Sequence, residues 1–425
     1  MQSERVRVMS GMEIIGGRRL CGEITPHGAK NSALPLLAAT LLPKGESVIH
    51  NCPRLSDVDA AVEIMKYLGC RVSVEGDVVT ADATQMTRYD IPERLMREMR
   101  SSISFLGAIL TKTGRAELSM PGGCELGARP IDLHLSALRR MGAVIDEKHG
   151  FIRCRCDGRL KGTAITLSFP SVGATENIMI AAALAQGTTV ITNAAREPEI
   201  SDLADYLNKC GARISGFGSG TITIEGVETL SATEHRVIPD RIEAATYMAA
   251  AAITGGKLVL KGTENEHLRS VLSAFEESGC QIRQKRNMLV LEAPRRLEPV
   301  RFIRTMPYPG FPTDAQAIIM AMTTVARGSS VFVETIFDNR FKHTWELMRL
   351  GARIKTEGRV AVVEGVDRLF GAQVESTDLR GAAALIIAAL AAEGKTTVGA
   401  LRHLDRGYEK FEEGLCSLGA CVRRI

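Results

Sequence analysis

This 425-residue sequence is poor in aromatic residues, which make up 4% of the chain and include a single tryptophan. It has no dense stripe of lysine and arginine interleaved with aromatic side chains, and its formal net charge is only +4. Nucleic-acid-binding surfaces normally show such a stripe. We therefore expect no nucleic-acid partner, although a modest excess of arginine in one cleft would attract small anionic substrates.

Long hydrophobic runs are also missing. The longest apolar run, 382–392, is much shorter than the roughly 20 residues that cross a bilayer. The first twenty residues lack the apolar core of a secretory signal peptide. Ten cysteines in so long a chain do not form a disulfide framework. We therefore expect a cytoplasmic protein with reduced thiols and no membrane partner.

Six approximate copies of one unit organise the chain. In each copy a helix ends at a glycine that is followed by a small residue and a strand, as in LGCRVSV and LGARIKT. Glycine at this position adopts the left-handed conformation that closes the last helical turn. These glycines recur every 68 to 73 residues and are Gly69, Gly142, Gly211, Gly279, Gly351 and Gly419.

A second pattern recurs in phase with these glycines: an Ala/Leu-rich helix, a glycine turn and a β-branched strand, as in LAQGTTVIT. Each unit then reads as strand, helix, strand, helix and closing hairpin. Helices such as 174–186 are apolar on most faces, so we expect them inside the domain with the sheets outside. Six units predict an α/β fold of two lobes with three units each, and ligands usually bind between such lobes.

The segment PGGCELGARPID, 121–132, is the most informative for chemistry. Its two glycines allow a tightly turned loop with Cys124 exposed at the tip. Arg129 follows five residues later, and a guanidinium or bound anion nearby would shift the pKa of the thiol from its free value of about 8.5. The other nine cysteines, such as Cys70 and Cys280 after repeat glycines, are expected to be small core residues.

Two motifs place charged residues near helix starts, and each has a plain structural alternative. In GAKNSALPLL, Lys30 and Asn31 begin a helix whose positive end would bind an anion, but Lys30 also fits a solvated loop. In FPTDAQA, Asp314 is either a general base toward a substrate hydroxyl or the N-cap of a helix. Local sequence favours the cap for Asp314 and leaves Lys30 undecided.

Arginines beside acidic residues supply further cations. Asp378 and Arg380 in TDLRGAA, and Asp405 and Arg406 in LDRGYE, are expected at helix starts in the last unit, and either pair could be merely structural. Such cations could bind a phosphate and a carboxylate together. The candidate cations are Lys30, Arg100, Arg129, Arg241, Arg380 and Arg406.

Motifs for a cofactor or a metal are not found. The segment GFGSG, 216–220, lies between two strands and predicts a hairpin turn. Cys154 and Cys156 have no partner pair at zinc-binding spacing, and the eight histidines are scattered. We therefore expect no metal and no cofactor.

Motifs spread from Gly28 to Glu409 resemble those of the UDP-N-acetylglucosamine enolpyruvyl transferases. They include GAKNSALPLL, PGGCELGARPIDLHL, FPTDAQA, ETIFDNRF, TDLRGAAAL and LDRGYE, in family order. The PGGC loop with GARP downstream distinguishes this family from its shikimate-pathway relative. The resemblance implies an inside-out α/β barrel of two lobes, each with three βαβαββ units. One lobe would comprise residues 1–29 and 237–425, and the other residues 30–236.

The resemblance also implies a reaction. Enolpyruvate moves from phosphoenolpyruvate to the 3-hydroxyl of UDP-N-acetylglucosamine by addition and elimination, releasing phosphate, in the first committed step of peptidoglycan precursor synthesis. Cys124 would give a proton to the methylene carbon and could form a covalent adduct with phosphoenolpyruvate. Asp314 would accept the hydroxyl proton.

The remaining site residues implied by the resemblance bind substrate. The phosphate and carboxylate would be held by Lys30, Arg129 and Arg406, with Arg380 nearby. The sugar nucleotide would lie against Asn31, Arg100, Arg129, Pro130, Ile131, Asp132, Leu133, Phe169, Pro170, Ser171, Val172 and Ile336.

Two positions depart from the family pattern. Ser104 stands where an aromatic residue is frequent, and Asp338 stands where Glu is common. Two alternatives therefore stay open: a catalytically weak or regulatory paralogue, and a shikimate-type transferase. Retention of the catalytic candidates argues against the first, and the PGGC loop argues against the second.

Overall fold

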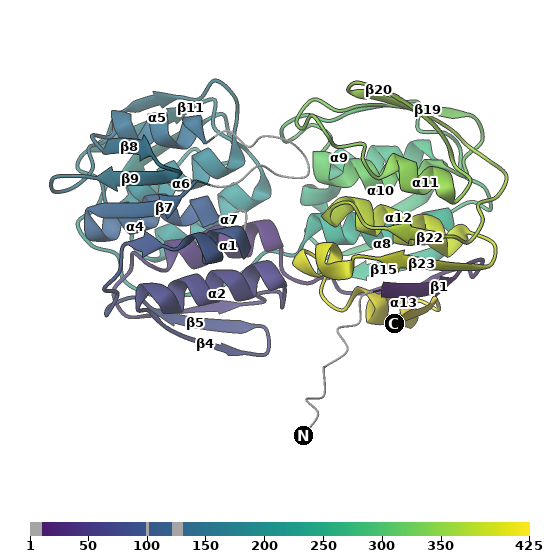
Figure 1. Ribbon diagram of the computed structural model, residues 1–425, viewed down its shortest axis with the longest axis horizontal. Coiled ribbons are helices and arrows are strands. Elements are labelled where there is room, and N and C mark those ends of the chain that lie inside the picture. The colour runs from purple at the N-terminus through teal and green to yellow at the C-terminus, as the bar shows by residue number, and fades with distance from the viewer. Residues whose placement is uncertain (1–10, 99–101, 121–130) are drawn as a thin grey trace. The chain divides into compact units, whose positions relative to one another are not determined.

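The computed structural model describes residues 11–98, 102–120 and 131–425, which form two compact units (Figure 1). Unit 1 comprises residues 11–26 and 240–425, and unit 2 comprises the described residues between 27 and 239. The chain passes from one unit to the other after Pro26 and after Pro239.

Each unit contains three four-stranded sheets of one topology. A parallel pair of strands is extended by two antiparallel strands, as the predicted closing hairpin requires. The sheets of unit 2, in spatial order, are β14 (Glu234–Arg236), β3 (Glu46–His50), β5 (Val78–Asp82) and β4 (Arg71–Glu75); β6 (Asp90–Ile91), β7 (Arg115–Ser119), β9 (Phe151–Arg155) and β8 (Val144–Lys148); and β10 (Ala164–Thr166), β11 (Thr188–Thr192), β13 (Thr221–Glu225) and β12 (Arg213–Ser215).

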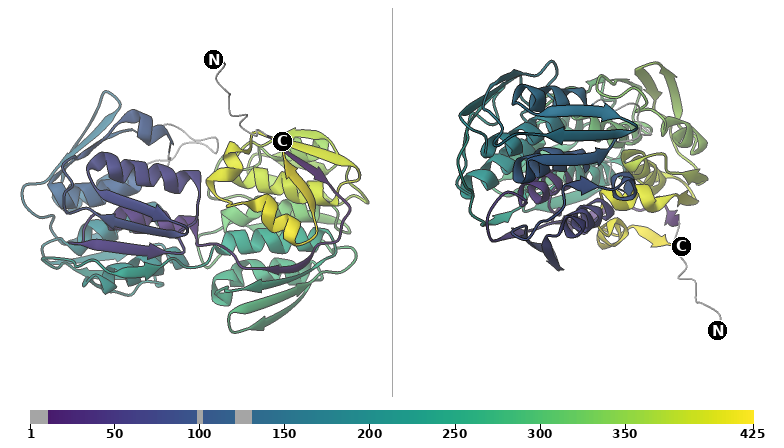
Figure 2. Two further views of the ribbon diagram at one scale, coloured as in Figure 1. Left: turned by 90° about the horizontal axis from the view of Figure 1, so that it is seen from below. Right: turned by 60° about the vertical axis from the view of Figure 1, so that its left-hand side comes forward.

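Unit 1 repeats this topology with one difference, which concerns the N-terminal strands. The sheets of unit 1 are β16 (Gln281–Lys285), β17 (Met288–Glu292), β15 (Lys257–Lys261) and β2 (Cys21–Ile24); β18 (Phe302–Arg304), β19 (Ser329–Val333), β21 (Val360–Glu364) and β20 (Arg353–Glu357); and β22 (Gln373–Glu375), β23 (Lys395–Gly399), β1 (Gly11–Ile15) and β24 (Cys421–Arg424). Strand β1 lies antiparallel between β23 and β24, where Figure 2 shows it in purple among yellow strands. It takes the place that β5 or β21 holds in its own sheet, so the last unit is completed by the beginning of the chain.

Apolar helices fill the interior of each unit, and the two units have separate hydrophobic cores. Every residue of α8 and all but the two end residues of α12 are buried, which no amphipathic surface helix would show. The central helices are α1 (Lys30–Ala39), α4 (Phe105–Thr113) and α6 (Val172–Ala183) in unit 2, and α8 (Arg241–Ile253), α10 (Thr313–Thr323) and α12 (Leu379–Ala391) in unit 1. The predicted arrangement of helices inside and sheets outside is confirmed.

The remaining helices each bury one side. They are α2 (Ser56–Leu68), α3 (Glu93–Glu98), α5 (Asp132–Arg140), α7 (Pro198–Lys209), α9 (Asn265–Glu277), α11 (Thr344–Arg349) and α13 (Phe411–Ser417), with the 3₁₀ helices η1 (Ser102–Ser104) and η2 (Leu401–Arg406). Within the described part of the chain, no helix combines the length and apolarity that spanning a membrane requires.

Local predictions about turns are confirmed. The six repeat glycines all have positive φ, between 89° and 102°. The predicted closing hairpin of the second unit is formed by β8 and β9, and His149 and Gly150, with φ of 55° and 77°, make its turn. Residues 216–220 connect β12 and β13 as a hairpin. These outcomes depend on short-range geometry, which explains why sequence predicted them.

The prediction that nine cysteines are core residues is wrong for two of them. Cys70 and Cys280 are buried in their repeat slots, but Cys21 and Cys416 are exposed. Cys21 begins strand β2 on its solvent-facing side. Cys416 lies on the outer side of α13, where its thiol donates to the Val422 carbonyl at 3.2 Å. Neither follows a repeat glycine, so the packing constraint on that slot does not apply to them.

Candidate active site

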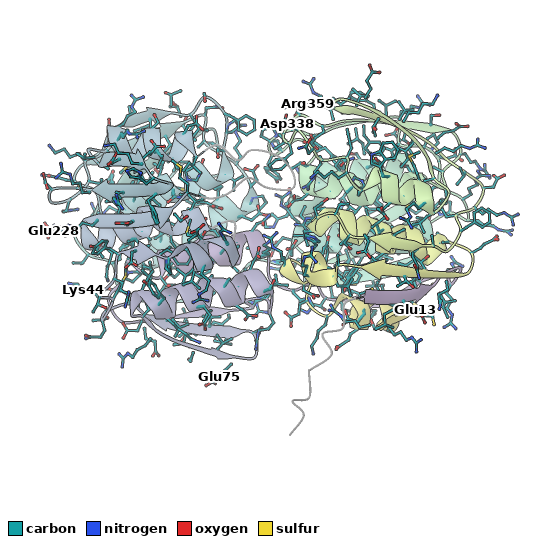
Figure 3. All side chains as sticks on the ribbon, in the orientation of Figure 1. Glu13, Lys44, Glu75, Glu228, Asp338 and Arg359 are labelled. Carbon is teal, nitrogen blue, oxygen red and sulfur yellow. The ribbon has the colours of Figure 1, made fainter. Side chains whose placement is uncertain are left out.

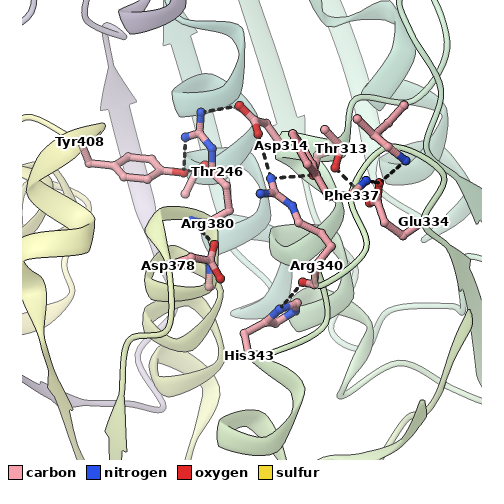
Figure 4. A network of polar contacts seen from close by, with 12 residues as sticks. Thr246, Thr313, Asp314, Glu334, Phe337, Arg340, His343, Asp378, Arg380 and Tyr408 are labelled. Atoms are coloured by element: carbon pink, nitrogen blue, oxygen red, sulfur yellow. Dashed lines mark hydrogen bonds and ion pairs between the residues drawn. The ribbon is translucent and has the colours of Figure 1, made fainter. Parts of the chain in front are cut away.

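Asp314, the predicted general base, is held between two arginines in unit 1 (Figure 4). Nη2 of Arg340 lies 2.8 Å from Oδ1 of Asp314, and Nη2 of Arg380 lies 2.9 Å from Oδ2. Both arginine side chains are almost fully buried, whereas the Asp314 side chain is 27% exposed. One guanidinium on each oxygen stabilises the charged carboxylate and fixes its orientation.

The place of Asp314 in its helix differs from the N-cap that local sequence favoured. Helix α10 begins at Thr313, and Pro312 occupies the N-cap position with extended backbone, φ −72° and ψ 133°. The N-cap interpretation is therefore wrong, because helical backbone starts one residue before Asp314. As the second residue of α10, Asp314 directs its carboxylate toward Arg340 and Arg380.

The loop after β19 carries Arg340 and is fixed to the first turn of α10. Oε1 of Glu334 accepts the N–H groups of Ile336 and Phe337 at 2.8 and 3.1 Å, and Oε2 accepts the Thr313 hydroxyl at 2.9 Å. Nη2 of Arg340 also donates to the Thr313 carbonyl at 3.0 Å. These bonds hold Ile336, a predicted sugar-nucleotide contact, on the same loop as the arginine that holds Asp314.

Arg380 is fixed by the start of α12. Oδ1 of Asp378 accepts the N–H groups of Arg380 and Gly381, each at 3.0 Å, so the predicted helix start is confirmed. Nη1 of Arg380 donates to the Tyr408 hydroxyl at 3.1 Å. Burial alone would lower the pKa of Arg380, but Asp314, Tyr408 and Asp240 together outweigh this effect and the pKa is raised. Arg380 is therefore a permanent buried cation.

Asp405 and Arg406 do not lie at a helix start, and that expectation is wrong. They end the 3₁₀ helix η2. The two Asp405 oxygens accept from Nη1 and Nη2 of Arg424 on β24, at 3.1 and 2.6 Å. This bidentate bond draws the segment toward the last strand of the chain.

A buried histidine supports the arginine that contacts Asp314. Nδ1 of His343 bonds to the Arg340 carbonyl at 3.2 Å. Burial lowers the pKa of His343 to about 4, and the nearby Asp378 carboxylate only partly offsets this effect. His343 is therefore neutral near pH 7, adds no charge beside Arg340, and donates from Nδ1 to the carbonyl.

Lys30 is the first residue of α1 in unit 2 and is buried rather than solvated. Its Nζ lies 2.5 Å from Oδ2 of Asp57, which is buried on α2. The solvated-loop alternative for Lys30 is therefore wrong. Asn31, the next residue, is exposed. The ion pair fixes the lysine at the positive end of α1, where an anion would be favoured.

The starts of α5 and α6 bring together several of the predicted sugar-nucleotide residues. Ile131 precedes α5, whose first turn contains Asp132 and Leu133, and Ser171 caps α6 by accepting the Ala174 N–H at 3.3 Å. His134 and Asn177 join the helices through a 2.9 Å bond. Beside this junction, Phe169 is 42% exposed while Pro170 and Val172 are half-buried.

Four predicted site residues, Arg100, Cys124, Arg129 and Pro130, lie outside the described residues. Of the two departures from the family pattern, Ser104 is buried at the end of η1. Asp338 forms an exposed ion pair with Arg359, and both are labelled in Figure 3. Across residues 11–98, 102–120 and 131–425 no group of three or more His, Cys, Asp or Glu side chains is arranged to hold a metal ion.

Sequence reasoning missed Arg340 and Asp57. Each makes a buried ion pair with a candidate residue from another segment of the chain. Arg340 stands in ETIFDNRF, a motif that had been singled out for Ile336 and Asp338 only. The sequence signal available for both was the charge of Lys30 and of Asp314 at the start of an apolar helix, since a buried charge needs an ionic partner.

Comparisons with known proteins identify the class of this fold. A family model described as EPSP synthase (3-phosphoshikimate 1-carboxyvinyltransferase) matches residues 14–415. The structure resembles that of the enolpyruvyl transferase NikO from Streptomyces tendae, with a TM-score of 0.88 and 27% identity, covering 97% of this chain and 98% of that one. It also shares the fold of an EPSP synthase from Acinetobacter baumannii, with a TM-score of 0.75 and 19% identity over 97% of this chain and 99% of that one. The fold is that of the enolpyruvyl transferases.

Curated relatives narrow the class further. A protein of Caldanaerobacter subterraneus subsp. tengcongensis named UDP-N-acetylglucosamine 1-carboxyvinyltransferase 2 is 52% identical over 417 residues, covering 98% of this chain and all of that protein. A Dichelobacter nodosus protein of the same name, without the final numeral, is 49% identical over 418 residues, covering 98% and 99%. This chain belongs to the UDP-N-acetylglucosamine 1-carboxyvinyltransferase family and is a transferase of the carboxyvinyl group.

Proposed function

We propose that this chain transfers the enolpyruvyl group of phosphoenolpyruvate to the 3-hydroxyl of UDP-N-acetylglucosamine, releasing phosphate. The acceptor is the one in the names of relatives at 49 to 52% identity, whereas the EPSP synthase neighbour is 19% identical. The reaction would commit the sugar nucleotide to peptidoglycan precursors in the cytoplasm. No metal, nucleic acid or membrane takes part in the proposed reaction.

The proposed transfer proceeds in two steps, an addition and an elimination. In the addition, the sugar hydroxyl oxygen bonds to C2 of phosphoenolpyruvate, C3 gains a proton and the hydroxyl loses one. In the elimination, the bond from C2 to the phosphate oxygen breaks with its electron pair leaving on phosphate, and C3 loses a proton. We propose Cys124 as the donor to C3 and Asp314 as the acceptor of the hydroxyl proton.

The observation that carries this proposal is the fixed, partly exposed carboxylate of Asp314. Two guanidinium groups hold its oxygens in place, which orients a proton acceptor before the substrate arrives. The same guanidiniums weaken it as a base, because they favour the charged form. For Asp314 to act as a base, an anionic substrate must therefore compete with its carboxylate for one of the two guanidinium groups. Arg380, proposed to lie near the substrate phosphate and carboxylate, is the arginine suited to this exchange.

Binding roles follow from charge. Phosphoenolpyruvate carries a phosphate and a carboxylate, and we propose that Lys30, Arg129 and Arg406 bind them with Arg380 nearby. The buried pair between Lys30 and Asp57 would keep the ammonium charged and oriented. The sugar nucleotide would contact the starts of α1, α5 and α6, and Ile336 on the loop after β19. The contacts proposed there are Asn31, Arg100, Arg129, Pro130, Ile131, Asp132, Leu133, Phe169, Pro170, Ser171, Val172 and Ile336.

Phosphate release with each acceptor tests this function. We expect phosphate to be released from phosphoenolpyruvate when UDP-N-acetylglucosamine is present, and not when shikimate 3-phosphate replaces it. Release with shikimate 3-phosphate alone would overturn the proposed acceptor. Release with neither acceptor, while the protein still binds the UDP-sugar, would favour the regulatory paralogue.

A further inference from the structure

Arg406, a proposed ligand of the substrate phosphate and carboxylate, is the last residue of the short 3₁₀ helix η2. Gly407 follows it and packs closely against the first residue of α12, since a Cβ on this glycine would lie 2.6 Å from Cδ2 of Leu379. The hydrogen-bond geometry of 3₁₀ turns is poorer than that of α-helices. The direction in which the Arg406 side chain projects therefore depends on the contacts that hold residues 405–408 from outside.

Tyr408 fixes the side of this segment that follows Arg406 (Figure 4). Its hydroxyl accepts from Nη1 of Arg380 on α12 at 3.1 Å. The Thr246 hydroxyl donates to the Ile242 carbonyl at 2.7 Å, so the Tyr408 hydroxyl is the donor in its 2.9 Å bond to Thr246 on α8. The buried Tyr408 side chain is therefore held by two central helices at once.

Asp405 fixes the side that precedes Arg406, and it does so through Arg424 on β24. Nη1 and Nη2 of Arg424 donate to Oδ2 and Oδ1 of Asp405 at 3.1 and 2.6 Å. The third nitrogen, Nε, donates to Oε1 of Glu412 on α13 at 2.7 Å. A bidentate bond fixes orientation as well as distance. Arg424 thus holds the residue next to Arg406 in one orientation.

Arg424 is itself attached to a paired strand. It lies opposite Met12 in the pairing of β24 with β1. The next residue, Ile425, donates its N–H to the Gly11 carbonyl at 2.9 Å and accepts the Gly11 N–H at 3.2 Å. The anchor for Asp405 therefore belongs to the sheet β22–β23–β1–β24 and not to a loose chain end.

Arg423, the preceding residue, provides an internal comparison. Successive strand residues point to opposite faces of a sheet. The Arg423 side chain is 71% exposed, and its Nη2 lies 2.9 Å from Oε1 of Glu13 on β1. Arg423 and Arg424 thus share residue type, strand and ion pairing, but the ion pair of Arg424 leads to the residue before Arg406.

We propose that Arg424 is a positioning residue for phosphoenolpyruvate, because through Asp405 it sets the backbone from which the Arg406 guanidinium reaches the phosphate and carboxylate. This role rests on the proposed function, in which Arg406 binds these groups. Since Tyr408 ties the same segment to Arg380, one framework would align both guanidiniums. Bonds from guanidinium to phosphate and carboxylate are directional, and a misplacement of about 1 Å can cost up to about a hundredfold in rate.

Steady-state kinetics of Arg424→Gln test the proposal, with Arg423→Gln as the matched control. We expect kcat/KM for phosphoenolpyruvate to fall by about tenfold in Arg424→Gln, mainly through a higher KM. The KM for UDP-N-acetylglucosamine should stay unchanged, because the proposed contacts of the sugar nucleotide do not include Arg406. Arg423→Gln should change neither KM. A variant that only folds less completely would lose kcat through a smaller amount of active enzyme and keep both KM values.

Two further variants test whether Arg424 acts through Asp405 and Arg406. Asp405→Asn removes the carboxylate and keeps Arg424, so it should lower kcat/KM for phosphoenolpyruvate by a similar factor. This variant carries the test if Arg424→Gln does not fold. In Arg406→Gln, the additional change Arg424→Gln should cause no further loss. A further loss of about tenfold would show that Arg424 acts on something other than Arg406 and would contradict the proposal.

Failure of the positioning role can be told apart from failure of the proposed function. Equal kcat/KM for phosphoenolpyruvate in Arg424→Gln and Arg423→Gln, with an active wild type, would overturn only the role of Arg424. A wild type without turnover would refute the proposed function. Isothermal titration calorimetry with phosphoenolpyruvate then decides the role of Arg424, which requires binding about tenfold weaker in Arg424→Gln than in Arg423→Gln. Equal affinities, or a wild type that does not bind phosphoenolpyruvate, would overturn it.

Discussion

Removal of the Arg340 guanidinium should expose how strongly Asp314 depends on its two arginines. In Arg340→Gln the contact between Nη2 and Oδ1, at 2.8 Å, is lost, while the 2.9 Å contact to Arg380 remains. Breaking a fully buried pair costs about 3–5 kcal/mol. Asp314 is 27% exposed and keeps one partner, so the solvent-screened coupling between Arg340 and Asp314 should be smaller. We expect a coupling free energy of about 1–2 kcal/mol between these two side chains.

A double-mutant cycle measures this coupling. The free energy of unfolding from urea titration is compared for the wild type, Arg340→Gln, Asp314→Asn and the double variant. The double variant should be more stable than the sum of the single losses predicts, by the coupling energy. Turnover supplies a second readout, because we expect Arg340→Gln to lower kcat more than it raises KM if the arginine positions the base. Strictly additive losses in stability, together with an unchanged kcat, would refute the argument.

The remaining predictions concern the thiols and a buried histidine. Cys124→Ser should reduce turnover by about a hundredfold or more, because a serine hydroxyl is a much weaker proton donor, and it should not reduce folding stability. Steady-state kinetics and thermal denaturation check these two expectations. A wild-type rate would exclude Cys124 as the essential acid. Fosfomycin, an epoxide analogue of phosphoenolpyruvate, should alkylate Cys124 in preference to the exposed Cys21 and Cys416, and peptide mass mapping that finds equal labelling of all three would contradict a selective site. Burial lowers the pKa of His134 from 6.5 to about 4, so the unfolded chain binds a proton that the folded chain rejects and stability should fall as the pH drops from 6.5 toward 4. The penalty approaches about 3 kcal/mol, and urea titrations of His134→Gln should show a smaller loss over this range, whereas an identical pH dependence would show that other groups are responsible.

Much of the fold could be predicted because its signals are local. The repeat glycines mark helix ends by their own conformational preference, and the uninterrupted apolar pattern of α12 predicts burial without knowledge of its neighbours. Strand β1 carries no such signal. Its five residues read as an ordinary strand, and its partners β23 and β24 lie at the other end of the chain. Only the family resemblance indicated that the beginning of the chain belongs with its end.

The site was predictable in its residues and less so in its contacts. Asp314 was found as a charged residue near a helix start, but the local pattern favoured a cap, because Asp is common at such positions. The bonds that decide its role come from Arg340 and Arg380, which are distant in sequence. The arrangement at η2 likewise depends on Arg424 of the last strand. Long-range ion pairs have no periodicity from which a single sequence can reveal them.

The pairing of β1 with β23 and β24 also constrains the order in which the protein can fold during synthesis. Strand β1 is synthesised long before its partners, because β23 (Lys395–Gly399) and β24 (Cys421–Arg424) follow it by more than 370 residues, whereas the sheet of β2 is already complete at Glu292. The described residues of unit 2 all lie between 27 and 239, so this unit can close as soon as residue 239 has emerged. Until β23 and β24 have been synthesised, the backbone N–H and C=O groups of β1 lack their strand partners. We therefore expect chaperones to bind the nascent chain at this stage.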